Sequence, residues 1–201
     1  SQADNAQPSD TTLANSFLQF GAGEYGLGRY FLTTYGYSNS QTNSGAYMGA
    51  VGVSATGAGK YELVFGTRDV TTDTAPTERM RIDTLGNVGI GVVPEAWSSL
   101  YGTKALQVGA QASLSDINGD LHLSSNAYYD ATNARWEYIN ADYATKYTQV
   151  DGVHQWLTAA SGTADAAITF TQAMTLDASG NLLVGGTSAG QDGAVTLSNT
   201  G

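Results

Sequence analysis

Histidine, the commonest side chain in general acid–base catalysis, occurs only twice in this chain of 201 residues. Neither His122 nor His154 has a nucleophile and an orienting carboxylate arranged around it in the sequence, and both lie in strand-like runs. Activated nucleophiles need such an arrangement, so we predict structural roles for both histidines. Pairs of Asp and Glu could hydrolyse glycosidic bonds if the fold brought them together, but the sequence marks out no such pair.

The segment GAGEYG, residues 21–26, matches the G-x-G-x-x-G pattern of a dinucleotide-binding loop. A dinucleotide site also needs a helix directly after the loop and an acidic residue about 20 positions further on. The following segment, LGRYFLTTYGYSNS, has no helical pattern, and no Asp or Glu occurs between Glu24 and Glu62. We therefore predict a glycine-rich turn and expect no cofactor.

The segment DINGD, residues 116–120, resembles the beginning of a calcium-binding loop. Such a loop needs a glycine at its sixth position and a bidentate Glu at its twelfth. Here the glycine comes early and Ala127 occupies the twelfth position. Asn118-Gly119 is instead a strong hairpin signal, so we predict a turn and no metal. The chain has no cysteine, which excludes disulfides and thiolate metal sites.

Tyrosine and tryptophan gather between residues 126 and 156 and give the richest functional signal in the chain. Their rings present flat apolar faces beside a polar group, and sugars have apolar faces that stack on such rings. The candidate carbohydrate-binding residues are therefore Tyr128, Tyr129, Trp136, Tyr138 and Trp156. The alternative is that these rings pack in a β core or between chains. The strand-like runs around Trp136 and Trp156 favour that alternative.

The composition is neutral and polar, not charged. Only 13% of the residues are charged, where roughly 25% is typical, and 25 residues are glycine. The net charge of -10, with eight Lys and Arg, argues against nucleic acid and against an anionic membrane surface. No run of about 18 apolar residues occurs, so we expect no membrane insertion. The first residues, SQADNAQPSDTT, have neither the basic nor the apolar region of a signal peptide.

Short strand-like runs separated by turns predict an all-β fold. The clearest runs lie at 16–20, 61–66, 104–109, 120–125, 135–139, 153–159 and 167–170. Helical periodicity is nearly absent, and the best helical candidate is PEAWSSLYG at 94–102, where a proline followed by Glu is a start signal.

Two stretches, RMRIDTLGNVGIG at 79–91 and AMTLDASGNLLVG at 173–185, repeat one another in register. In each, an Asp at the first position and a Gly at the fourth position predict a type I turn between two short strands. The structural turn residues are thus Asp83, Gly86, Asn87, Asp177, Gly180 and Asn181. A second match, FLQFG at 17–21 with ALQVG at 105–109, lies upstream of each stretch.

The repeat divides the chain into a polar linker at 1–16, a first β unit at 17–94, a connector at 95–104 and a second unit at 105–188. Residues 189–201 are interpreted as the start of a further unit or a tail. A thin, glycine-rich unit of this size buries little apolar area by itself. We therefore expect an elongated oligomer in which several chains wrap together and approach closely at glycines such as Gly89 and Gly91.

The segment ERMRIDTLGNVGIG at 78–91, followed by Pro94, resembles a repeat of bacteriophage tail fibre proteins. In those fibres the repeat often precedes a self-cleaving intramolecular chaperone domain. NAYYDATNARWEYI at 126–139 and the segment at 155–188 resemble the same class, so the resemblance extends from about residue 17 to 188. It implies an elongated, intertwined homotrimer of short antiparallel strands and hairpins in two tandem units, located in the virion.

The same resemblance implies a structural, non-enzymatic role in host attachment. The partners would be a bacterial surface glycan or protein receptor and other tail or fibre proteins. Two alternatives remain at this stage. One is a tailspike-like polysaccharide depolymerase, and the other is a non-viral trimeric surface filament or adhesin.

Overall fold

The computed structural model describes residues 27–36, 41–185 and 195–197. The predicted linker at 1–16, the predicted strand at 16–20 and the predicted glycine-rich turn at 21–26 lie outside these ranges, as do residues 189–194 and 198–201.

Short strands account for nearly all the regular structure in the described ranges, with one 3₁₀ turn, η2 at Leu100–Gly102. The strands are β1 (Tyr30–Tyr35), β2 (Ala46–Ser54), β3 (Lys60–Thr67), β4 (Thr77–Ile82), β5 (Val88–Ile90), β6 (Lys104–Val108), β7 (Ala112–Ile117), β8 (Asp120–Ser125), β9 (Ala127–Tyr129), β10 (Trp136–Tyr138), β11 (Ala144–Val150), β12 (Val153–Ala159), β13 (Thr171–Leu176), β14 (Leu182–Val184) and β15 (Val195–Leu197). The prediction of an all-β fold is confirmed.

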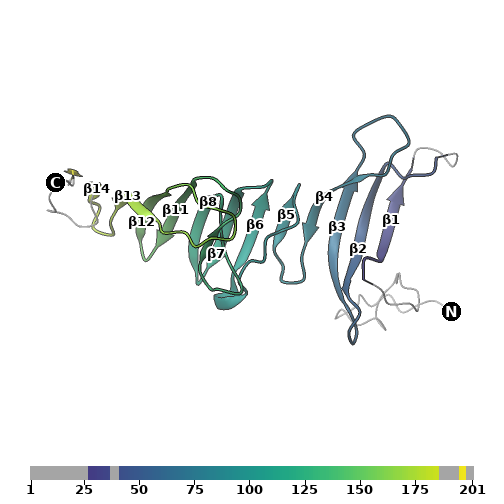
Figure 1. Ribbon diagram of the computed structural model, residues 1–201, viewed down its shortest axis with the longest axis horizontal. Coiled ribbons are helices and arrows are strands. Elements are labelled where there is room, and N and C mark those ends of the chain that lie inside the picture. Colours follow the sequence, from purple (N-terminus) through teal and green to yellow (C-terminus); the bar gives the residue numbers. More distant parts are fainter. Residues whose placement is uncertain (1–26, 37–40, 186–194, 198–201) are drawn as a thin grey trace, which may run out of the picture.

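A single sheet of 13 strands forms the frame of the molecule, and each of its strands pairs with the next one in chain order. The exception is the separate β9–β10 hairpin, which is inserted between the paired strands β8 and β11. Neighbours in the sheet are antiparallel except β5 and β6, which are parallel. At about 4.8 Å per strand such a sheet is about 60 Å long. Figure 1 shows the strands following one another along the long axis of the molecule.

The two repeated stretches form matching hairpins, β4–β5 and β13–β14. In the first, the backbone N–H of Gly86 donates to the carbonyl of Asp83 at 3.0 Å, which closes the turn. Gly86 has a φ of +86°, a left-handed conformation that glycine adopts at no steric cost. In the second, Gly180 donates to the carbonyl of Asp177 at 3.0 Å and also has a φ of +86°.

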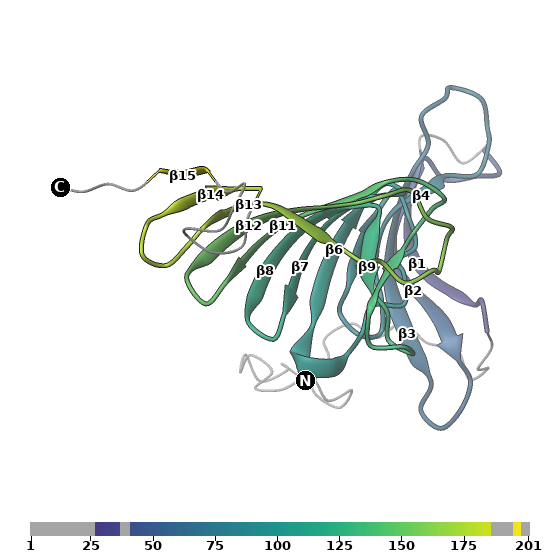
Figure 2. The ribbon, with the colours of Figure 1, turned by 60° about the vertical axis from the view of Figure 1, so that its left-hand side comes forward.

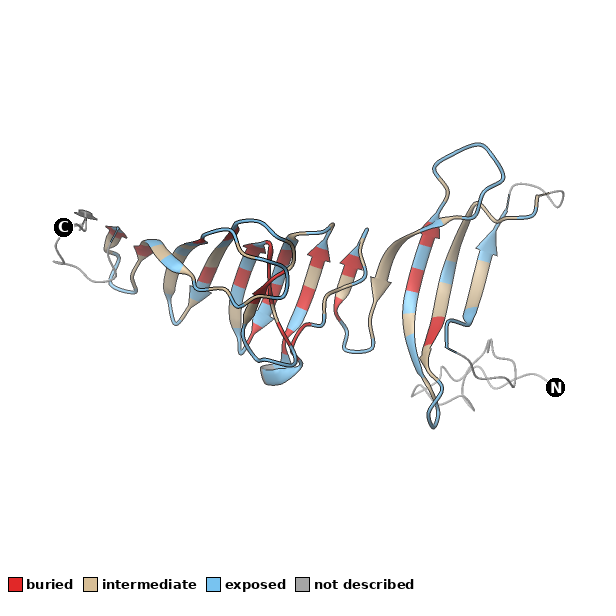
Figure 3. Ribbon diagram, viewed as in Figure 1, coloured by how far each residue is buried: buried red, intermediate tan, exposed pale blue. Residues whose placement is uncertain are grey.

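The β9–β10 hairpin and the segment 160–170 lie over one face of the sheet (Figure 2). We call this side, which carries Gln107, Ser115, His122 and Thr148, the covered face, because all four side chains are buried. The opposite side is the open face. Figure 3 shows how buried and exposed residues alternate along the central strands, as expected when only one face is covered.

Five of the predicted strand runs are confirmed. Residues 120–125 and 153–159 coincide with β8 and β12, 61–66 lies within β3, 104–109 contains β6, and 135–139 contains β10.

The helix predicted at 94–102 is wrong, because only the 3₁₀ turn η2 forms there. Trp97 is fully buried, and its ring meets that of Tyr128 edge-on at 6.1 Å. Its backbone forms an isolated antiparallel bridge with Asp130. A helix of two turns is marginal on its own, so burial of the tryptophan decides the local structure.

The strand predicted at 167–170 is also wrong. Only Ala167 forms a bridge, with Glu137 of the β9–β10 hairpin, and the rest of the run is irregular. Ile168 and Phe170 pack against the buried cluster of Ala127, Tyr138, Ala144 and Ala159. The apolar residues of this run therefore anchor a covering loop and do not extend the sheet.

Candidate assembly face and ligand groove

An unbroken line of apolar residues crosses the open face. Each member stands directly opposite the next on the neighbouring strand, with one residue from each of the strands β1–β8 and β11–β14. We call this line the apolar row. Its members are Phe31, Ala50, Leu63, Ile82, Val88, Leu106, Leu114, Leu123, Tyr147, Trp156, Met174 and Val184.

No member of the apolar row is buried in the single chain. Leu123 is 55% exposed, Leu63 is 50% exposed and Leu114 is 42% exposed. Monomeric proteins rarely expose contiguous apolar patches of more than a few hundred Å². A row that runs the length of a sheet of about 60 Å is therefore typical of a surface that is covered in the functional state.

The covered face shows the opposite chemistry, because its central strands bury small polar residues. Ser113, Ser115, Ser124 and Thr148 are all buried there. The Ser113 and Ser124 hydroxyls lie 2.7 Å apart, and the Ser124 hydroxyl also donates to the carbonyl of Ala127 at 3.2 Å. These short side chains let the β9–β10 hairpin approach closely. In the central strands β6–β8 all the leucines, namely Leu106, Leu114, Leu121 and Leu123, stand on the open face.

A hollow lies along the apolar row beside the parallel pair β5–β6. Its volume is about 340 Å³, and its walls include Val88, Leu106, Leu114 and Leu121. Lys104 and Asp116, which are paired across β6 and β7, stand at its edge. The hollow is large enough to receive an apolar side chain from another molecule.

The structure brings four of the five predicted carbohydrate-binding residues together in the β9–β10 hairpin. Tyr128 and Tyr138 are buried, with 4% and 6% of their surface exposed, so neither presents an open ring face. The Tyr138 hydroxyl donates to the carbonyl of Ala160, and the Tyr128 hydroxyl donates to the Glu137 carboxylate at 3.2 Å. Burial, and then the bond to Glu137, raises the pKa of Tyr128. Both positions favour the packing alternative.

Trp136 is the centre of a partly buried aromatic group. Its ring meets those of Tyr129, His122 and Phe170 edge-on at 5.8, 5.2 and 6.1 Å. The ammonium of Lys146 lies 4.1 Å from the centre of the Trp136 ring. Burial lowers the pKa of Lys146 to about 8. Cation–π contact therefore compensates the lysine for part of its lost hydration.

Trp156 is separate from the other four residues. It lies in the apolar row on the open face, opposite Tyr147 on one side and Met174 on the other, and its ring centre is 5.1 Å from that of Tyr147. Trp156 is therefore a member of the apolar row and not of the aromatic group in the β9–β10 hairpin.

The two histidines also differ in their surroundings. His122 is buried on the covered face, and burial, followed by the charge of Lys146, lowers its pKa to about 4. His154 bonds through Nδ1 to the Tyr147 hydroxyl on the open face. Within the described residues, no three His, Asp or Glu side chains gather as metal ligands.

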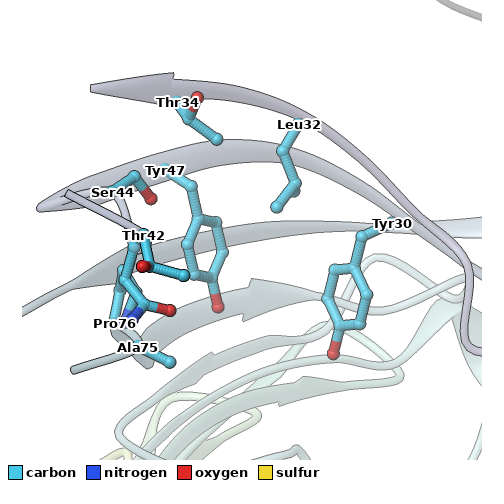
Figure 4. A pocket seen from close by; sticks show the side chains of 9 residues that line it. Tyr30, Leu32, Thr34, Thr42, Ser44, Tyr47, Ala75 and Pro76 are labelled. Carbon is cyan, nitrogen blue, oxygen red and sulfur yellow. The ribbon is translucent and has the colours of Figure 1, made fainter. Parts of the chain in front are cut away.

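A second feature is an open groove of about 470 Å³ where β1 and β2 meet two loops (Figure 4). The strands contribute Tyr30, Leu32, Thr34 and Tyr47, and the loops contribute Thr42, Asn43, Ser44, Ala75 and Pro76. Figure 4 shows the rings of Tyr30 and Tyr47 on the same side of the strands. No sequence pattern predicts this groove, because its walls come from segments about thirty residues apart.

One carboxylate joins the two loops of the groove. Asp73 accepts hydrogen bonds from the backbone N–H groups of Thr42 at 2.7 Å and Asn43 at 3.0 Å. The side-chain amide of Asn43 donates a hydrogen bond to the backbone carbonyl of Asp73 at 3.1 Å, and the Arg68 guanidinium donates to the Asp73 carboxylate at 3.3 Å. These backbone bonds, that from Thr42 first, lower the pKa of Asp73. The carboxylate is therefore charged at neutral pH.

A scan against protein-family models finds no family that matches the chain, and a search of curated proteins finds no matching sequence. Within the described ranges, no helix has the length and apolar character needed to cross a membrane.

Proposed function

We propose that this protein is a structural and host-recognition segment of a bacteriophage tail fibre, which assembles as a homotrimer and attaches the virion to a bacterial surface. The observation that carries the assembly part of the proposal is the apolar row. The sequence resemblance at 78–91, 126–139 and 155–188 supports the viral class.

Another copy of the same chain fits the apolar row best. Any partner must present an apolar strip of matching length, and a second copy of the chain carries the same row. Burying the row also contributes favourable free energy at about 25 cal/mol for each Å² of apolar surface removed from water. The hollow of Val88, Leu106, Leu114 and Leu121 offers a place for side chains of the neighbouring copies.

The apolar surface of the open face is wide near β2–β6 and narrow near β8–β12. From β2 to β6 a second apolar line stands beside the row, made of Met48, Phe65, Met80, Ile90 and Val108. From β8 to β12 the row is flanked by Ser125, Thr145 and Thr158 on one side and by Leu121 and Gln149 on the other. In this narrow part, two sheets packed face to face would bury the polar flanks along with the row, whereas three sheets around one axis leave them near solvent. The narrow part therefore favours three copies over two.

A trimer also suits attachment. Three equivalent chains present three copies of any receptor site, and binding at several sites together can exceed the affinity of one site by factors of about 10² to 10⁴. The segment would thus act as an extracellular rod that contacts the host glycan or protein receptor and the adjoining tail or fibre proteins. We expect no bond-cleaving activity.

Sedimentation equilibrium of the purified chain tests the assembly. We expect a trimer for the wild type and monomers for Leu123→Lys and Leu114→Lys, which place a charge in the apolar row. Leu85→Lys is the matched control, because Leu85 is 45% exposed in a hairpin turn outside the row. A monomeric or dimeric wild type would contradict the trimer, and trimeric Leu123→Lys would contradict the choice of face.

A further inference from the structure

We propose that the groove of Tyr30, Tyr47, Thr42 and Asn43 binds an uncharged saccharide. The inference rests on the proposed function, because the saccharide would be part of a bacterial surface polysaccharide. It places recognition at the β1–β2 end of the sheet, not in the aromatic segment 126–156.

The chemistry of the groove suits an uncharged polyhydroxylated ligand. Hydroxyl and amide groups of Thr34, Thr42, Asn43 and Ser44 can each donate and accept hydrogen bonds. No charged side chain lines the groove. A phosphorylated or sulfated ligand would find no cation in the wall and would approach a chain of net charge -10.

The two tyrosines supply the apolar surface on which a sugar ring could stack. Tyr30 is 50% exposed, so its ring is accessible. The Tyr47 ring lies directly over Gly66 on β3, where a methyl group would come within 2.2 Å of the ring. The Tyr47 hydroxyl is protonated at neutral pH, as a tyrosine normally is, and burial raises its pKa further, so it can donate a hydrogen bond.

The groove is also built before any ligand arrives. The Asp73 carboxylate fixes the backbone of Thr42 and Asn43, and Arg68 holds Asp73 and the carbonyl of Thr74. A site whose loops are already ordered loses less conformational entropy on binding. Its volume of about 470 Å³ lies in the range of roughly 300–1,000 Å³ usual for small-molecule sites.

The other aromatic groups are less suitable for a saccharide. Tyr128 and Tyr138 are buried residues of the β9–β10 hairpin, and Trp156 belongs to the apolar row, which the trimer would cover. The groove differs from these aromatic groups, because it combines accessible rings with a polar wall.

Isothermal titration calorimetry on the full chain tests the groove, with maltohexaose and fully N-acetylated chitohexaose as probes. We expect at least one of these uncharged hexasaccharides to bind and a sulfated heparin hexasaccharide not to bind. Tyr30→Ala should weaken binding about tenfold, which corresponds to the loss of about 1.4 kcal/mol of stacking. Tyr143→Ala is the control, because Tyr143 is 68% exposed and lies far along the sheet, just before β11.

Titrations with glucose and N-acetylglucosamine then show whether the groove binds a polysaccharide or only a free monosaccharide. Binding of the monosaccharides alone would contradict a surface polysaccharide as the ligand. No binding of either uncharged hexasaccharide, or equal binding by Tyr30→Ala and wild type, would overturn the groove proposal. Sedimentation equilibrium on the same samples keeps the two proposals apart. A trimer that fails to bind contradicts only the groove, whereas a monomer that binds contradicts only the assembly.

Discussion

The residues Asp83 and Asn87 have a larger role than turn formation. The Asp83 carboxylate accepts bonds from the backbone N–H groups of Leu85 and Asn87, both at 2.8 Å, and from the Asn87 amide at 2.8 Å. The Asn87 side-chain oxygen then accepts the backbone N–H of Ala105 at 3.1 Å. Asn87 therefore ties the end of the first hairpin to β6, across the only parallel pair of the described sheet.

The second copy keeps the same local bonds. Asp177 accepts from the backbone N–H groups of Ser179 and Asn181 at 2.9 Å and from the Asn181 amide at 2.9 Å. The Asn181 amide, and then its backbone N–H, lower the pKa of Asp177. The turn could be predicted from the Asp-to-Gly spacing. The link to Ala105 could not, because it depends on a residue 18 positions away.

The burial of His122 gives the protein a defined response to pH. A histidine whose folded-state pKa lies near 4, below its unfolded value of about 6.5, binds its proton more tightly in the unfolded chain. Its contribution to stability is present above pH 6.5 and is lost as the pH falls toward 4. The melting temperature should therefore decrease between pH 7 and pH 5.

Thermal unfolding of three proteins checks this dependence. The wild type and His154→Gln should both lose stability between pH 7 and pH 5, whereas His122→Gln should show a shallower decrease. Equal slopes for His122→Gln and wild type would show that His122 is not the group that titrates.

At the scale of elements, local pattern predicted strands well and covering segments poorly. β8 and β12 were predicted residue for residue, because their apolar residues alternate between clear turn signals. In the β9–β10 hairpin, only β10 was predicted as a strand, from the run at 135–139. Neither β9 nor the departure of the hairpin from the main sheet was predicted. The position of the hairpin depends on Trp97 and Tyr128 meeting across about thirty residues, which no local pattern contains.

The apolar row also could not be predicted from local sequence pattern. The sequence indicates that Met80 and Ile82 share a face, and that Val88 and Ile90 do so as well. It does not indicate that Ile82 stands opposite Val88 in a line that continues from Phe31 to Val184, because that requires the register of every strand pair. The groove was not predictable for the same reason.

The hairpins themselves can be tested by changing the glycines that close their turns. Gly86→Val and Gly180→Val each force a β-branched residue into a φ of +86°, which such residues adopt only with strain. We expect each change to cost about 1–3 kcal/mol and to weaken assembly, as measured by chemical unfolding and by sedimentation. Leu85→Val, in the same turn as Gly86 but without the left-handed conformation, serves as the control. Unchanged stability in both glycine variants would refute the turn assignment.

At the scale of the whole molecule, a sheet of 13 strands exceeds the roughly 10 strands that open twisted sheets usually reach without curling or splitting. Among the residues that the structure describes, the β9–β10 hairpin and the segment 160–170 cover only the central part of one face. The ends of the sheet must therefore draw stability from another source. The apolar row is the feature that extends over both ends.

Stability should therefore depend on protein concentration. If unfolding includes separation of the chains, mass action raises the melting temperature as concentration increases, whereas a self-sufficient monomer melts at one temperature. We expect calorimetry over a hundredfold range of concentration to show a rising melting temperature for the wild type. Leu123→Lys should melt lower and at a temperature that no longer depends on concentration, while Leu85→Lys should behave as the wild type. A constant wild-type melting temperature, together with a monomeric mass, would mean that the chain stabilises its open face alone and that the apolar row has no partner in solution.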